Sequence, residues 1–107
     1  MSSDYVAIHS AAMRAADAAV EGMEDVGFCG YGYVRISPGT HGFCRWLREH
    51  AGASTVRTGL FKGTHLSSRA GQQAYATNAA WVRTYADEVN RHFPDSEVVA
   101  IGLVRAD

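Results

Sequence analysis

The alternation of apolar and polar positions predicts three helices along the chain. Residues 4–26 carry polar side chains at intervals of three and four positions, which form one face of a helix, with mostly small apolar side chains opposite them. Residues 38–51 follow Ser37 and begin with Pro38, a pair that suits the first turn of a helix. The longest apolar stripe of helical period runs through residues 69–93 and predicts the third helix.

Three further stretches have the composition of strands. Residues 28–36 alternate in character, and residues 55–62 form a weaker pattern that is followed by a predicted loop over 63–66. In residues 97–104, six of the eight side chains are apolar. Because such a nearly continuous apolar run is typical of a strand covered on both faces, we expect this last strand in the interior of the sheet.

The resulting order of elements is α-β-α-β-α-β. It predicts an α+β fold with a small three-stranded mixed or parallel sheet packed by helices. The whole chain, residues 1–107, is expected to form a single domain, in which the acidic N-terminal helix 4–26 precedes an α/β core over residues 28–107. Gly30 and Gly32 are unusual inside a strand and predict a bulge or the close approach of another backbone.

The composition is that of a globular domain, with 107 residues of which 47% are hydrophobic and 20% charged. No apolar run approaches the roughly 18 residues of a membrane span, and the N-terminal residues do not resemble a signal peptide. Two cysteines, Cys29 and Cys44, are too few for a disulfide framework. We therefore expect a cytoplasmic protein with no membrane partner.

The net charge of −1 hides an uneven distribution of charges. Residues 1–28 contain five acidic residues and one basic residue, whereas residues 35–69 contain six basic residues and one acidic residue. The basic middle third predicts attraction to anions such as phosphates, nucleotides or an acidic protein surface. The alternative is a solvated basic face whose partner is the acidic first helix.

The strongest candidate site is the predicted turn from the first strand into the second helix. The strand delivers Arg35 to a helix start, where backbone amides and the partial positive charge of the helix favour an anion. Thr40 and His41 add hydrogen-bonding groups, and Arg45 lies one turn further along. Tyr33 has an aromatic ring on which a base could stack. Arg69 lies at a second predicted helix start. The candidate ligand-binding residues are Tyr33, Arg35, Thr40, His41, Arg45 and Arg69. The alternative is an ordinary capped turn with solvated arginines.

The sequence lacks catalytic motifs. It contains no Gly-x-Ser-x-Gly, no phosphate loop ending in Gly-Lys-Ser/Thr and no His-Glu-x-x-His. The glycine-rich stretch 27–32 follows a helix and opens a strand, the reverse of a dinucleotide-binding motif. His41, Cys44 and His65 have ligand chemistry for zinc, and Cys44 has that of a nucleophile, but burial as a small apolar residue is the commoner role of such a cysteine. We expect no enzymatic activity, no cofactor and no metal.

Residues 32–47, Gly-Tyr-Val-Arg-Ile-Ser-Pro-Gly-x-x-Gly-Phe-x-x-Trp-Leu, resemble a family of small uncharacterised α+β proteins encoded by bacteriophages and other mobile elements. The likeness covers residues 28–107 and includes an early tyrosine of the third helix, Tyr75, and a C-terminal Arg-x-Asp that begins at Arg105. The second strand, with Arg57 and Lys62, departs from the aromatic-rich version of the family. The resemblance implies phage origin and action in the host cytoplasm, without an established activity.

Two classes of function fit these observations. The first is a non-enzymatic binder of a small anionic, nucleotide-like ligand, such as a host defence signal that a phage protein sequesters. The alternative is a protein-interaction module that docks on a host or virion protein through the acidic first helix or a free sheet edge. A third possibility, single-stranded nucleic-acid binding, is disfavoured by the near-neutral net charge. Because a small sheet has two edges to cover, we also expect a homo-oligomer, most simply a two-fold dimer.

Overall fold

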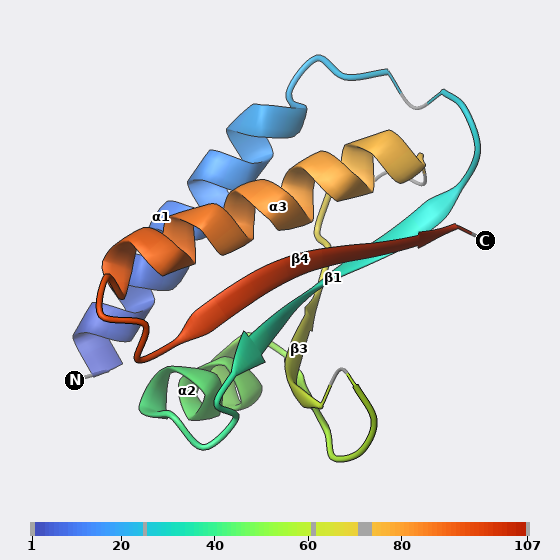
Figure 1. Ribbon diagram of the computed structural model, residues 1–107. Helices are drawn as coiled ribbons and strands as arrows, with labels where there is room; N and C mark the ends of the chain where they lie inside the picture. Colours follow the sequence, from blue (N-terminus) through green and yellow to red (C-terminus); the bar gives the residue numbers. More distant parts are fainter. Residues whose placement is uncertain (1, 25, 61, 71–73, 107) are drawn as a thin grey trace.

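The computed structural model describes residues 2–24, 26–60, 62–70 and 74–106 and combines helices with one antiparallel sheet (Figure 1). No helix among these residues is long and apolar enough to cross a membrane. The elements are α1 (Ser2–Val20), β1 (Gly30–Ser37), α2 (Gly42–His50), β2 (Ser54–Val56), β3 (Gly63–Ser67), α3 (Tyr75–His92) and β4 (Val99–Ala106).

The strands of the sheet lie in the order β2-β3-β1-β4, and each neighbouring pair is antiparallel. β1 lies in the middle, with Arg35 opposite His65 of β3 on one side and opposite Ile101 of β4 on the other. From β1 onward the chain follows β-α-β-β-α-β, the split β-α-β pattern of ferredoxin-like domains. The α+β class is therefore confirmed, but the predicted three-stranded, mixed or parallel sheet is wrong in strand number and direction.

The additional strand is β3, which occupies the segment predicted to be a loop. Thr64 and Leu66 are buried and His65 between them is only partly buried, which is the period-two alternation of a strand. The pattern is hard to recognise in the sequence because one of the two inward residues is polar. β3 pairs with β2 and with β1, so that all neighbours run antiparallel. The predicted strand 55–62 is correspondingly short, and its residue 61 lies outside the described part of the chain.

β4 lies at the edge of the sheet, which corrects the expectation of an interior strand. Val98 and Ala100 are buried, but Val99 is 41% exposed and Ile101 is 43% exposed. Leu103 is partly buried. A run of branched apolar residues predicts burial on both faces, yet α3 covers only one face of β4, and the other keeps its apolar side chains in contact with solvent.

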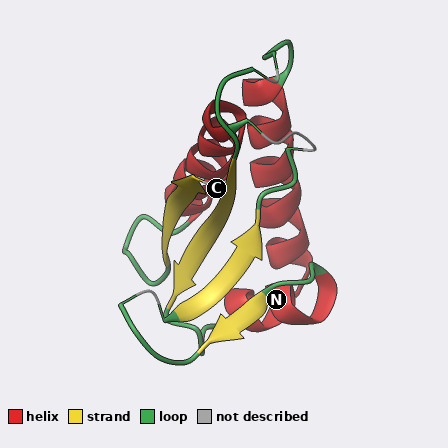
Figure 2. Ribbon diagram, turned by 90° about the vertical axis from the view of Figure 1, so that its right-hand side faces the viewer, coloured by secondary structure: helices red, strands yellow, loops and turns green. Residues whose placement is uncertain are grey.

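The helices lie on one side of the sheet and leave its other face uncovered (Figure 2). The core fills the space between the two layers and is built largely by α3, whose Trp81, Val82 and Tyr85 are fully buried. β1 contributes Val34 and Ile36 to the same core, also without exposure. We call the uncovered side the open face; it carries the alternate residues of each strand, among them Tyr31, Tyr33 and Arg35 of β1.

α3 approaches β1 and β4 closely at the points where these strands carry glycine. A Cβ atom added to Gly32 would lie 3.0 Å from Val82 Cγ1. One added to Gly102 would lie 2.7 Å from the backbone of Val82 and Arg83. The distance at Gly102 excludes a larger residue unless the helix moves, and at Gly32 the nearest backbone atom of the helix, the Asn78 carbonyl oxygen, would lie at 3.3 Å. The close backbone approach predicted from the glycines of the first strand is therefore confirmed.

All three helices are shorter than the sequence pattern predicts. α1 ends at Val20, well before residue 26, because Gly22 adopts a positive φ of 80°, the left-handed conformation that commonly terminates helices. α3 begins at Tyr75. The predicted start at Arg69 lies instead in the segment between the end of β3 at Ser67 and the first turn of α3. Residues 71–73 of the predicted third helix lie outside the described residues.

The start of α2 also differs from its prediction. Ser37 is the last residue of β1 and pairs with β4, so it is not the residue that caps the helix. The helix begins at Gly42 with His41 as its N-cap, and His41 Nδ1 accepts a hydrogen bond of 3.0 Å from the amide of Phe43. The turn therefore extends through residues 38–41 before the helix starts.

Two polar contacts join α1 to α3. His9 Nδ1 lies 2.7 Å from the hydroxyl oxygen of Tyr85, and the Trp81 indole donates a hydrogen bond of 2.9 Å to Asp17 Oδ1. Burial, and to a lesser extent the charge of Arg69, lowers the pKa of His9. Burial raises the pKa of Tyr85, so the phenol keeps its proton and can donate it to the neutral imidazole.

The close contact of α3 with β4 predicts a large cost for Gly102→Ala. The added methyl group would overlap the helix backbone, and we expect the free energy of unfolding to fall by about 1–3 kcal/mol, measured by urea denaturation. Gly39→Ala is the matched control, because its Cβ would meet other atoms only at 3.6 Å or beyond. Equal stability of the two variants would contradict the proposed contact.

The lowered pKa of His9 predicts that stability falls in mild acid. The unfolded state binds a proton at the ordinary histidine pKa of 6.5, whereas the folded state binds it only at lower pH. The contribution of His9 to stability is therefore complete above about pH 6.5 and declines as the pH falls below it. Urea unfolding across this range should show a weaker pH dependence for His9→Gln than for the native protein. An unchanged dependence would show that His9 titrates alike in both states.

Candidate functional site

Three arginines surround one hollow beside the turn that leads from β1 to α2. The hollow has a volume of about 450 Å³. Arg45 and Arg48 lie three residues apart on α2, which places them on one face of the helix. Arg57 directly follows β2. We call this site the arginine hollow; its lining residues are Gly39, Thr40, Arg45, Arg48, Thr55 and Arg57.

Arg48 is held in place at the base of this hollow. Its Nη1 donates hydrogen bonds of 2.8 Å to the Gly39 carbonyl and of 2.8 Å to Thr64 Oγ1. Thr64 is fully buried in β3, so Arg48 links the turn to the sheet. Arg45 and Arg57 are exposed. The lining thus combines one fixed guanidinium with two that can adjust to a ligand, and it includes no carboxylate among the described residues.

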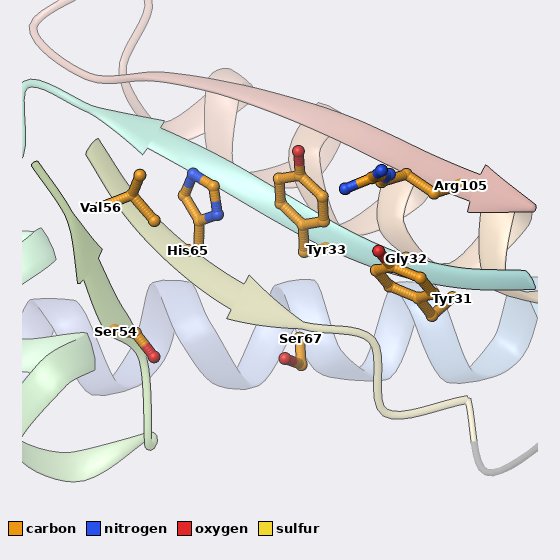
Figure 3. A pocket seen from close by; sticks show the side chains of 8 residues that line it. All are labelled: Tyr31, Gly32, Tyr33, Ser54, Val56, His65, Ser67 and Arg105. Atoms are coloured by element: carbon orange, nitrogen blue, oxygen red, sulfur yellow. The ribbon is translucent and has the colours of Figure 1, made fainter. Parts of the chain in front are cut away.

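A second hollow, of about 350 Å³, lies on the open face of the sheet (Figure 3). The rings of Tyr33 and His65 stack there, with centroids 4.5 Å apart and planes inclined by 15°. The Arg105 guanidinium lies 5.8 Å from the centroid of the Tyr31 ring. Ser54, Val56 and Ser67 complete the side chains that line it. This hollow joins aromatic surfaces to a cation.

The candidate residues from the sequence are divided between these places. Thr40 and Arg45 line the arginine hollow. Tyr33 and Arg35 lie on the open face, where Arg35 Nε donates a hydrogen bond of 2.8 Å to the Lys62 carbonyl. The prediction that Arg35 and Arg45 grip one ligand at the turn thus meets a geometric obstacle. Arg35 belongs to the uncovered side of the sheet and does not line the hollow at the turn.

The other two candidate residues have structural contacts. His41 caps α2, and its ring packs edge-on against Phe93, with centroids 5.4 Å apart. Arg69 donates a hydrogen bond from Nη2 to the carbonyl of Ala51, just beyond the end of α2. Neither residue lines either hollow. Their contacts account for them as parts of the fold.

The structure adds residues that the sequence did not single out for these sites. Arg48 could have been found from its spacing of three residues from Arg45 on the same helix. The approach of Arg57 to α2 and of Arg105 and His65 to the aromatic rings depends on strand pairing. The positions of Arg57 and His65 depend on β3, which the sequence pattern did not predict, and that of Arg105 depends on the antiparallel pairing of β1 with β4.

The cysteine and histidine candidates for metal or nucleophilic chemistry are dispersed. In the described ranges, no group of three or more histidine, cysteine or acidic side chains could hold a metal ion. Cys44 is buried, and its Sγ lies 3.7 Å from the Ile36 carbonyl. Burial raises the pKa of this thiol, which keeps it protonated. Its surroundings are those of a packed side chain.

Comparison with known proteins gives no relative from which a function could be transferred. The chain matches no family model, no curated protein and no solved structure. Function is therefore inferred from the two hollows.

Proposed function

We propose that the protein is a non-enzymatic binder of a small phosphate-bearing ligand, held in the arginine hollow. The observation that carries this proposal is that three arginines and two threonines line one space, whose lining among the described residues includes no carboxylate. Each guanidinium presents a planar fork of donors that matches phosphate oxygens. A volume of about 450 Å³ is within the range of small-molecule sites.

The lining chemistry favours binding over catalysis. Glycine, threonine and arginine orient and neutralise phosphate oxygens, but arginine stays protonated and none of the three titrates near neutral pH. Arg48, fixed by the Gly39 carbonyl and Thr64, supplies a preorganised contact that loses little freedom when a ligand arrives. A nucleotide-like ligand satisfies this lining with its phosphate groups.

We further propose that the protein acts in a host cytoplasm, as the resemblance of residues 28–107 to phage-encoded proteins implies. A phage protein that binds a host nucleotide signal without turning it over lowers the free concentration of that signal. Such sequestration needs affinity and abundance but no reaction. The arginine hollow suits this counter-defence role because its lining holds an anion and provides no means of cleaving it.

Binding of inorganic phosphate, nucleoside monophosphates and cyclic dinucleotides can be measured by titration calorimetry and by the shift in melting temperature. A ligand that binds only the folded state raises the melting temperature. The double variant Arg45→Ala/Arg57→Ala loses two charge-assisted contacts of about 1.5–3 kcal/mol each, so affinity should fall roughly a hundredfold or more.

Arg14→Ala serves as the control for this experiment. It removes an exposed arginine from α1, away from the hollow, and should bind as the native protein does. Identical binding by the double variant and the control would exclude the arginine hollow as the site, as would the lack of any effect of these ligands on the native protein.

A second candidate function is protein interaction through β4, with a second copy of the chain as the simplest partner. β4 is an edge strand of eight residues that exposes Val99 and Ile101. Asn90 covers only the beginning of this edge. Its Oδ1 accepts a hydrogen bond of 2.8 Å from the Ala100 amide, and its Nδ2 donates one of 2.9 Å to the Ala100 carbonyl. A long edge with apolar side chains favours pairing with another strand. Pairing of two β4 edges would join two sheets and leave the open face accessible.

Sedimentation equilibrium tests this candidate. We expect a concentration-dependent dimer in the native protein and a monomer for Ile101→Lys, because a lysine at the joined edge opposes pairing. Leu60→Lys is the matched control, since Leu60 is 87% exposed and lies outside β4. A monomeric native protein at high micromolar concentration would rule out self-association through β4.

A further inference from the structure

Flat side chains stand side by side on the open face (Figure 3). Tyr33 and His65 form one stacked pair, and Tyr31 and Arg105 form a second pair of ring and guanidinium. The pairs come from three strands that the sheet brings together, since Tyr31 lies directly opposite Arg105 and Tyr33 is a diagonal neighbour of His65. Aromatic rings and guanidinium planes are the surfaces on which unpaired nucleobases stack.

The strand geometry gives these rings a spacing that suits stacking. Tyr31 and Tyr33 are two residues apart on β1, so their Cβ atoms are separated by roughly 6.6–6.8 Å. Consecutive stacked bases are separated by about 3.4 Å. This Cβ separation is close to two stacking intervals, which is the space that one further planar group needs between two parallel rings. The Arg105 side chain borders this space and can move aside or stack on the group that enters.

The charge around the rings is positive. Arg35 lies on the same side of β1, and Lys62, whose carbonyl accepts its hydrogen bond, is exposed. The lining of the hollow on the open face includes no aspartate or glutamate among the described residues. The acidic residues Asp4 and Asp17 belong to α1 and Asp87 and Glu88 to α3, and both helices lie on the other side of the sheet (Figure 2). The net charge of −1 thus does not describe this surface.

From this arrangement we propose that the open face binds single-stranded nucleic acid. One base stacks on the exposed side of the Tyr33–His65 pair and a second stacks against Tyr31 and Arg105. Arg35 and Lys62 contact the phosphates between and beside these bases. A duplex is excluded because its bases stack on each other and cannot reach the rings. A single nucleotide gains only one of the two stacking contacts, so a strand that spans both pairs binds more tightly.

This site is separate from the arginine hollow. Ser54 and Val56 line the hollow of the open face, whereas Thr55 and Arg57 line the arginine hollow. Successive residues of a strand point to opposite faces of the sheet. A ligand in one hollow therefore does not occupy the other, and the two proposals can fail independently.

Fluorescence anisotropy with a labelled, unstructured oligonucleotide of about 12 nucleotides tests the proposal. At about 50 mM salt the native protein should bind it, and the affinity should decrease as salt is added. Tyr33→Leu keeps an apolar side chain on the strand but removes the flat ring, and should weaken binding roughly tenfold. Tyr33→Phe should restore it, and Arg14→Ala, the control, should bind as the native protein does.

Several results would overturn the proposal. They are the absence of binding by the native protein, equal affinity for a duplex of the same sequence, and equal affinity of Tyr33→Leu and Arg14→Ala with both proteins folded. Amide spectra distinguish the two sites. The oligonucleotide should shift the signals of Tyr31, Tyr33 and His65. A shift confined to Thr40 and Arg57 would assign it to the arginine hollow and reject the open face.

Discussion

The contact between α3 and the two strands beneath it governs the rest of the structure. At Gly102 on β4 an added Cβ would lie 2.7 Å from the helix backbone at Val82 and overlap it, and at Gly32 on β1 it would lie 3.0 Å from the Val82 side chain and 3.3 Å from the Asn78 carbonyl oxygen of the same helix. The glycines must then face the helix. Because side chains alternate along a strand, Tyr31 and Tyr33, which flank Gly32, must face away from the helix. Tight packing on one side thereby produces an aromatic surface on the other.

The distribution of charge follows the same division into layers. α1 carries two acidic residues, Asp4 and Asp17, and Asp17 accepts a hydrogen bond from the Trp81 indole of α3, whereas Glu21 and Glu24 of the acidic N-terminal stretch follow the helix. The basic residues of the middle third lie on α2, on the sheet and on the turns between them. A chain of nearly neutral net charge can therefore present locally cationic surfaces. Binding of an anion depends on the local electrostatic potential at those surfaces, which cannot be read from the net charge of the chain.

The sequence predicted what depends on local periodicity and missed what depends on pairing. The α+β class, three helices, the buried face of α3 around Val82, and the close approach at Gly32 follow from spacing within single elements. β3 was missed because Thr64 is a polar residue in a buried position, which makes its strand pattern resemble a loop. The edge position of β4 was missed because an apolar run does not reveal whether one face or two are covered.

The same limit applies to the candidate sites. The predicted turn did contribute Thr40 and Arg45 to a common hollow, because both depend on the local path of the chain into α2. Arg35 was assigned to that turn from its position in sequence, but strand alternation directs it to the other side of the sheet. His41 has the right location, yet its Nδ1 is engaged by the Phe43 amide. A polar residue near a helix start can serve the helix as readily as a ligand.

The short strand β2 determines how the two hollows remain distinct. Its pairing with β3, in which Ser54 lies opposite His65, directs Ser54 and Val56 to the open face and leaves Thr55 on the side of α2. A shift of this pairing by one residue would exchange the two sets of side chains. It would bring Thr55 to the aromatic rings and take it away from Arg45 and Arg48. Because β2 has only three residues, its register cannot depend on its own hydrogen bonds alone. Arg48 of the arginine hollow bonds to Thr64, the residue of β3 that lies opposite Thr55, and so holds in place the strand with which β2 pairs.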